Sequence, residues 1–248
     1  MKDFIAQADR AALERHGLAG FDALWSVQLT AVDEPNVERG GWSSVFRLEL
    51  DDSAFYLKRQ SDHLTRTLAH PFGEPTFARE FRNIRRYARL GVPALQASFF
   101  GQRKVGGERR AVLLTRALDG WMDLDELLKR WPELGESNHQ AILVAVGGLA
   151  RTLHQAGQMH SCFYPKHIFL REQGGCWQAC LIDLEKTRPL LLGRRDRVKD
   201  LEPLVRRASV IGKQGVRHLL EAYLDDSRLV EPWLRQPHQR REAKEARQ

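Results

Sequence analysis

The residue types best suited to chemistry lie in three places along the chain. Their order is that of the groups that enzymes of phosphoryl transfer use. A stretch rich in glycine and serine comes first, and its backbone N–H groups could cover phosphates; its candidate residues are Gly40, Gly41, Ser43 and Ser44. A cation, Lys58, follows, and then a carboxylate, Asp183, that could bring in Mg²⁺. The glycine spacing falls short of the full G-x-G-x-x-G pattern, so an ordinary hairpin turn remains an alternative for the first stretch.

Lys58 ends an apolar segment, residues 55–58, much as the phosphate-pairing lysine of kinases ends its strand. Glu80, on the helix predicted to follow, is its expected ion-pair partner. The alternative is that Lys58 ends an exposed strand and that Glu80 pairs with Arg79 or Arg82 on its own helix. Asp183 directly follows a predicted buried strand, where the D-F-G aspartate of kinases holds Mg²⁺.

The segment around residue 160 resembles a kinase catalytic loop. The pattern H-R-D-x-x-x-x-N places its histidine at His160, its catalytic aspartate at Cys162 and its metal-binding asparagine at His167. Two of the three positions therefore depart from the pattern. His160 or Glu185 is a further candidate for orienting an acceptor hydroxyl, because both are near these loops in sequence.

From about Glu34 to Leu224 the chain is similar to the lipopolysaccharide kinase family of Gram-negative bacteria (InaA type). The segments that carry the resemblance are residues 38–44, 77–81, 153–160, 164–169, 182–186 and 199–201. The resemblance implies a protein-kinase-like fold, ATP with Mg²⁺ as cofactors, and transfer of the γ-phosphate to heptose of the lipopolysaccharide inner core. It also implies that Asp200 is a helix residue that braces the catalytic loop and does not touch ATP.

The elements expected around these residues form a bilobal α+β protein of the kinase-like class. Alternating patterns predict strands near residues 45–50, 54–58, 94–100 and 110–116, with a helix from residue 75 to about residue 91. Helices are expected at 124–131, 137–156 and 199–234, and short strands at 168–170 and 179–182. The expected division is an N-terminal lobe at 1–117, a C-terminal lobe at 118–234 and a mobile polar tail at 235–248.

Composition limits the setting and the partners. The chain has 248 residues, 42% of them hydrophobic and 29% charged, and neither an apolar signal-peptide core nor a membrane-spanning run was found. Three cysteines favour reduced thiols and a cytoplasmic location. The net charge of +7 suits an anionic partner, here a core glycolipid with peripheral contact at the inner membrane, or simply a solvated basic face. No motif indicates nucleic-acid binding.

Two other interpretations stay open at this point. A pseudokinase that binds ATP or partners without phosphoryl transfer would fit a cysteine at position 162, and the fold leaves room for a different phosphate acceptor. A zinc site at Cys176 and Cys180 is not predicted, because their spacing is not C-x-x-C.

Overall fold

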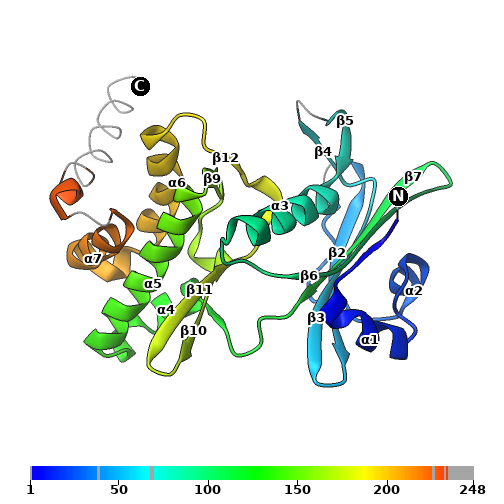
Figure 1. Ribbon diagram of the computed structural model, residues 1–248, viewed down its shortest axis with the longest axis horizontal. Coiled ribbons are helices and arrows are strands. Elements are labelled where there is room, and N and C mark those ends of the chain that lie inside the picture. Colours follow the sequence, from blue (N-terminus) through cyan, green and yellow to red (C-terminus); the bar gives the residue numbers. More distant parts are fainter. Residues whose placement is uncertain (1, 38–39, 68–69, 225–226, 232, 234–248) are drawn as a thin grey trace. The chain divides into compact units, whose positions relative to one another are not determined.

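The computed structural model describes residues 2–37, 40–67, 70–224, 227–231 and 233 (Figure 1). The expected polar tail at 235–248 and the first two residues of the 38–44 motif lie outside the described residues. The chain divides into two compact units: residues 1–89, 94–119 and 183–185 form the first, and residues 90–93, 120–182 and 186–248 form the second. Asp183, expected in the C-terminal lobe, groups instead with the first unit.

The first unit is built on a five-stranded antiparallel sheet in the order β1-β6-β7-β3-β2. Its strands are β1 (Phe4–Ile5), β2 (Trp42–Leu50), β3 (Ser53–Ser61), β6 (Ala97–Val105) and β7 (Glu108–Arg116). The four strands predicted in this unit are present and form two hairpins, with β2 paired to β3 and β6 paired to β7. The strand containing Lys58 was predicted to end there, but it continues to Ser61 because residues 59–61 go on pairing with both β2 and β7.

Helices lie on both faces of this sheet (Figure 1). Helices α1 (Gln7–Arg15) and α2 (Phe21–Ser26) pack Leu13, Phe21 and Leu24 against inward side chains such as Leu57. Helix α3 (Thr76–Leu90) covers the other face, where the rings of Phe81 and Phe100 stack at 4.4 Å. Because strand side chains alternate between faces, Lys58, next to Leu57, points to the face that α3 covers.

One hairpin in the first unit was not predicted. Strands β4 (Leu64–Thr67) and β5 (His70–Pro75) pair with each other and lead directly into α3. The pairing is irregular between Thr65 and Thr67, so the segment lacks the regular alternation that marked the other strands.

The second unit is mainly helical. Helices α4 (Leu124–Lys129), α5 (Glu136–Gln155), α6 (Arg194–Arg207) and α7 (Gly212–Leu224) accompany a three-stranded sheet of order β11-β10-β8. The strands are β8 (Met122–Asp123), β10 (Ile168–Gln173) and β11 (Cys176–Leu181), and a second small sheet pairs β9 (Gln158–Met159) with β12 (Arg188–Pro189). Short 3₁₀ turns lie at Trp131–Glu133, Pro165–His167, Ser209–Ile211 and Ser227–Leu229, and another, Leu184–Lys186, follows Asp183.

The prediction of one helix over residues 199–234 is wrong. The segment holds the end of α6 and the separate helix α7, with a 3₁₀ turn between them. Gly212 starts α7 with a φ of +63°, a backbone conformation that interrupts a right-handed helix and that glycine adopts without strain. Within the described part of the chain, no helix combines the length and apolarity needed to cross a membrane.

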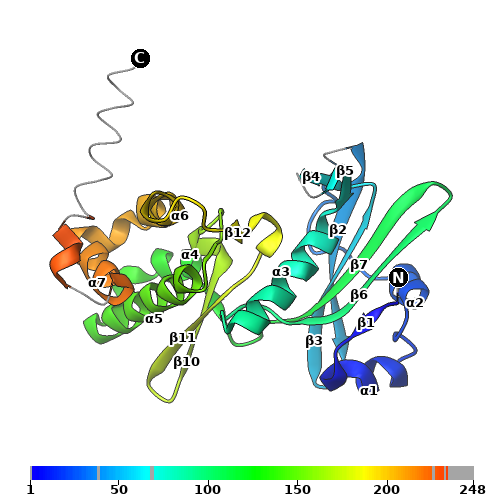
Figure 2. The ribbon, with the colours of Figure 1, turned by 45° about the horizontal axis from the view of Figure 1, so that its top comes forward.

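Helices α5 and α7 lie side by side in both views (Figures 1 and 2), and a glycine sets how closely they approach. A Cβ atom at Gly147 would lie 2.6 Å from the carbonyl oxygen of Leu219 and 2.8 Å from the Cβ of Ala222. The adjacent Gly148 has no such neighbour within 4 Å. The two glycines therefore differ in packing but share the same helix.

Gly147→Ala should destabilise the protein by about 1–3 kcal/mol, because the added methyl group forces α5 and α7 apart. Gly148→Ala is the matched control, and it should be neutral or stabilising by up to about 1 kcal/mol because alanine favours helix. Thermal unfolding of both variants measures the difference. Equal melting temperatures would contradict the close helix contact.

Candidate functional site

The predicted ion pair between Lys58 and Glu80 is present. The Nζ of Lys58 donates to Oε1 of Glu80 over 2.7 Å, and the side chains are 20% and 3% exposed. The same ammonium lies 5.8 Å from the centre of the Phe77 ring. Burial raises the pKa of Glu80, and the positive charge of Lys58 opposes that rise. The pair therefore holds a cation at a defined place on the α3 side of the sheet.

A buried glutamine that the sequence did not single out positions the helix carrying Glu80. The Oε1 of Gln60 accepts hydrogen bonds from the Thr76 hydroxyl at 2.7 Å and from the Phe77 N–H at 2.8 Å. Its amide nitrogen donates to the His63 carbonyl at 2.6 Å, and Gln60 is fully buried. Strand β3, which bears Lys58, thus also satisfies a free N–H in the first turn of α3. This contact fixes Lys58 and Glu80 relative to each other.

Asp183 lies in a constrained segment of the first unit. Its φ of +56° is in the left-handed region, which is costly for a residue other than glycine and is found most often at functional sites. The Nδ2 of Asn83, on α3, donates to the carbonyl of Leu184 at 2.8 Å and so ties this segment to the helix that carries Glu80. Burial is the main cause of the raised pKa of Glu80, and the negative charges of Asp183 and Glu185 raise it further. Asp183 is therefore electrostatically coupled to the Lys58–Glu80 pair.

The glycine-rich stretch is packed against the end of β3. A Cβ atom on Gly41 would overlap the backbone of Ser61 and Asp62, so only glycine fits there. Gly40 has a φ of +77° with open space around it. Ser43 is half-buried, whereas Ser44 is 6% exposed. Gly40, Gly41 and Ser43 stay candidates for phosphate contact, and the burial of Ser44 makes it the weakest of the four.

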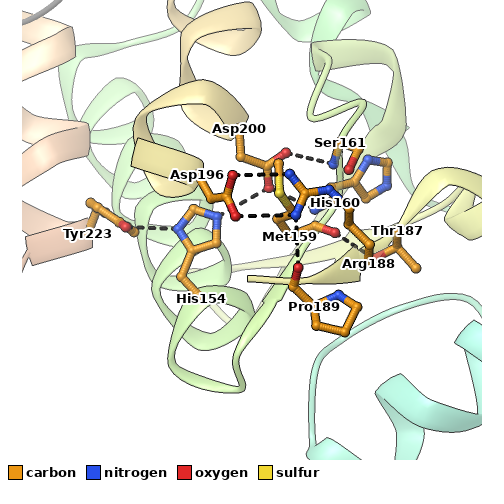
Figure 3. A network of polar contacts seen from close by, with 10 residues as sticks. All are labelled: His154, Met159, His160, Ser161, Thr187, Arg188, Pro189, Asp196, Asp200 and Tyr223. Carbon is orange, nitrogen blue, oxygen red and sulfur yellow. Dashed lines mark hydrogen bonds and ion pairs between the residues drawn. The ribbon is translucent and has the colours of Figure 1, made fainter. Parts of the chain in front are cut away.

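In the second unit, one carboxylate holds the loop that resembles a kinase catalytic loop (Figure 3). Asp200 on α6 accepts hydrogen bonds from the backbone N–H groups of His160 and Ser161, each at 2.7 Å. Ser161 has a φ of +66°, so the carboxylate stabilises a strained turn. The expectation that Asp200 braces this loop is confirmed.

Two further buried side chains extend this network. The Nε2 of His154 lies 3.2 Å from Asp200, and its Nδ1 lies 2.8 Å from the Tyr223 hydroxyl. Burial raises the pKa of Tyr223, so its hydroxyl remains a donor. A neutral His154 protonated on Nε2 satisfies every partner, because it donates to Asp200 and accepts from Tyr223. Helices α5, α6 and α7 thereby converge on the catalytic-like loop (Figure 3).

His160 is held inside the second unit. It is fully buried, and its Nε2 lies 2.9 Å from the carbonyl oxygen of Ile182, to which it donates. The ring is therefore directed at the backbone, and the role expected for it in orienting an acceptor hydroxyl stays a prediction. We therefore assign His160 a positioning role, since it fixes the peptide that precedes Asp183.

Cys162 and His167 lie together, but neither has the chemistry of the residue it replaces. Cys162 is 6% exposed, and its carbonyl oxygen accepts from Nδ1 of His167 at 2.9 Å. Mg²⁺ prefers oxygen ligands, so an imidazole is a poor substitute for asparagine in metal binding. The roles proposed for both residues stay predictions.

The residues near Asp183 fit a metal ion that is bound partly by the protein and partly by the phosphate oxygens of a nucleotide. Within the described ranges no group of three or more His, Cys, Asp or Glu could form a metal cage of its own. Mg²⁺ in nucleotide sites is typically bound by one or two carboxylates together with phosphate oxygens. Asp183 is such a carboxylate, and the strained backbone and bound Leu184 carbonyl hold it in a fixed segment.

None of the three cysteines, all of them described, forms a disulfide; Cys176 is exposed, and Cys162 and Cys180 are buried. Burial raises the pKa of Cys180 to about 12, so this thiol is unreactive at neutral pH.

Comparisons with known proteins show the family and the fold of this chain. Residues 22–223 match the lipopolysaccharide kinase (Kdo/WaaP) family. The chain is 33% identical over 179 residues to Protein InaA of Escherichia coli (strain K12), an alignment that covers 71% of this chain and 82% of that protein. Its fold is similar to that of WaaP in complex with acyl carrier protein, with a TM-score of 0.68 and 21% identity over 97% of this chain and 99% of that one.

The chain therefore belongs to the lipopolysaccharide kinase (Kdo/WaaP) family. Membership supports phosphotransferase activity on the lipopolysaccharide core, and a kinase implies ATP as the phosphate donor. The structural likeness adds a common mixed α/β fold with antiparallel sheets.

Asp200→Ala should destabilise the loop around residue 160, because it leaves two backbone N–H groups without their acceptor at about 1–3 kcal/mol each. Hydrogen exchange should be faster at the amides of His160 and Ser161 than at amides elsewhere in the second unit. Glu202→Ala, an exposed change on the same helix, is the control and should alter stability by less than about 0.5 kcal/mol. Unchanged exchange at both amides would contradict the bracing role.

Proposed function

We propose that this protein is an ATP-dependent kinase that transfers the γ-phosphate to heptose of the lipopolysaccharide inner core. We infer that its two units correspond to the lobes of a bilobal protein-kinase-like fold. The observation that carries the proposal is the ion pair of Lys58 with the buried Glu80, electrostatically coupled to Asp183. Phosphoryl transfer requires this combination of an anchored cation and a metal-binding carboxylate.

The residues divide the work as follows. Lys58 pairs with donor phosphates, and Glu80 keeps its ammonium in place. Asp183 would bind Mg²⁺, and Gly40 and Gly41 let the backbone approach the phosphates closely. His160 and Asp200 hold the backbone that leads to Asp183 and to the acceptor side. Bound ATP with Mg²⁺ supplies the phosphoryl group and neutralises charge as transfer proceeds.

Membership of the family supports the proposed acceptor and setting. Core heptose is a substrate at the membrane, so a cytoplasmic protein in peripheral contact with the inner membrane is the setting we propose. The structurally similar WaaP is described in complex with acyl carrier protein, which makes an acyl carrier protein a second candidate partner. A different phosphate acceptor is the alternative within the kinase class.

A pseudokinase is the second candidate function, and Cys162 is the observation that favours it. A thiol replaces the usual carboxylate base, and its residue is 6% exposed. In a loose transition state, however, the base contributes less than positioning and charge neutralisation. The anchored Lys58 and the constrained Asp183 supply both of these, so we favour the active kinase.

Lys58→Ala and Asp183→Ala should each lower turnover by about 10²-fold or more, measured as phosphate transfer from labelled ATP to purified core oligosaccharide. Lys104→Ala, an exposed lysine on β6, should leave turnover unchanged. A folded Asp183→Ala variant with near-normal transfer would remove Asp183 from the site.

The stability of Lys58→Ala should depend on pH through Glu80. Without the ammonium, burial raises the pKa of Glu80 further above its unfolded value, near 4.3. The folded state then binds the proton more tightly than the unfolded state, so stability is highest at low pH and falls as pH rises through the raised pKa. The double variant Lys58→Ala/Glu80→Gln should regain stability at pH 8 but not turnover. A pH-independent loss in the single variant would contradict the electrostatic account.

Cys162 separates the two candidate functions. In an active kinase, Cys162→Ala should lower turnover by no more than about 10²- to 10⁴-fold, the usual contribution of a general base, with ATP affinity nearly constant. If the wild-type protein binds ATP with Mg²⁺ but transfers no phosphate, and Cys162→Asp creates transfer, the pseudokinase interpretation is correct.

A further inference from the structure

Two exposed leucines lie in the loop before α6, in an otherwise basic segment. Leu191 and Leu192 are 76% and 57% exposed, and Gly193, Arg194 and Arg195 after them are also exposed. Residues 186–199 hold six Lys and Arg and one acidic residue, a net charge of 6 − 1 = +5. Scattered single apolar residues are normal on a surface, but adjacent leucines beside a dense positive charge are a feature of interaction sites.

The loop is held in this shape by a buried carboxylate. Asp196, 2% exposed, accepts from the backbone N–H groups of Leu191 at 2.8 Å and Leu192 at 3.0 Å. The guanidinium of Arg188 pairs with the same carboxylate at 3.0 Å, as Figure 3 shows. These partners lower the pKa of Asp196, so it remains charged at neutral pH.

The base of the loop is fixed as well. The N–H of Leu190 donates to the carbonyl of Gly157 at 2.9 Å, and β12 pairs with β9 just before it. Gly193 has a φ of +51°, which permits the sharp turn into α6. The backbone N–H groups of Leu190, Leu191 and Leu192 thus all donate to acceptors of the protein, while the side chains of Leu191 and Leu192 are exposed. The leucines are therefore presented by a rigid turn and are not simply part of a loose loop.

We propose that the loop at residues 190–195 docks on an anionic membrane surface, with Leu191 and Leu192 entering the interface and Arg194 and Arg195 meeting lipid phosphates. Apolar insertion combined with basic residues is how interfacial elements bind anionic bilayers. Charge complementarity favours this occupant over a neutral apolar partner. This inference rests on the proposed function, and it assigns the proposed membrane contact to a particular loop.

Vesicle sedimentation with the full chain tests the proposal without relying on phosphate transfer. The wild-type protein should bind phosphatidylglycerol-containing vesicles, bind pure phosphatidylcholine vesicles weakly, and lose affinity as salt rises. Leu191→Ser/Leu192→Ser should weaken binding by about tenfold or more, and Arg195→Gln by about fivefold. Val144→Ser, an exposed residue of similar exposure on α5, is the control and should bind like wild type.

Three results would overturn the proposal. One is unchanged vesicle binding by the folded double-leucine variant. Another is that the wild-type protein runs as a dimer on gel filtration and the double-leucine variant does not, while vesicle binding stays the same; the loop would then be a contact between two copies. The third is that the double-leucine variant loses phosphate transfer equally to soluble core oligosaccharide and to an acceptor embedded in vesicles. That result would place the leucines in the substrate site. Absence of all transfer by wild type with normal vesicle binding would refute the proposed function alone.

Discussion

The carboxylate of Asp200 is the constraint on which the second unit depends. It is 1% exposed, and it accepts two backbone N–H groups from a turn whose Ser161 is in a left-handed conformation. Without that acceptor the turn would lose both its hydrogen bonds and the compensation for its strain. Asp196, one helical turn earlier on the same face of α6, holds the neighbouring loop in the same way. One helix thus orders two neighbouring loops through two buried carboxylates (Figure 3).

The first unit uses a different device, a buried ion pair. Removing Lys58 and Glu80 from water is costly, and such a pair often adds little net stability compared with apolar packing. Its presence between β3 and α3 is therefore better explained by a need for a fixed cation than by a need for stability. Gln60 and Asn83 serve that need, since one caps the helix that carries Glu80 and the other ties the Asp183 segment to it.

Much of this arrangement could be predicted from local sequence. The alternation around Lys58, the helical spacing around Glu80 and the glycine turn between β6 and β7 are local signals, and each predicted an element that is present. The Lys58–Glu80 pair followed from the likeness of that strand and helix to the kinase lysine motif, and the bracing by Asp200 followed from the resemblance. Gln60 and Asn83 could not be predicted, because a buried amide has no periodicity and Asn83 finds its partner 101 residues away. The burial of His160 could not be predicted either, because burial is a property of the fold and not of the motif.

The central claim is that the anchored cation and the constrained carboxylate serve phosphoryl transfer to a sugar. The most direct test is mass spectrometry and ³¹P NMR of purified core oligosaccharide after incubation with the protein, ATP and Mg²⁺. The account predicts one added phosphate, seen as a new phosphomonoester on a heptose hydroxyl, and none with Asp183→Asn. An oligosaccharide that stays unmodified while the same protein sample demonstrably binds ATP would contradict it.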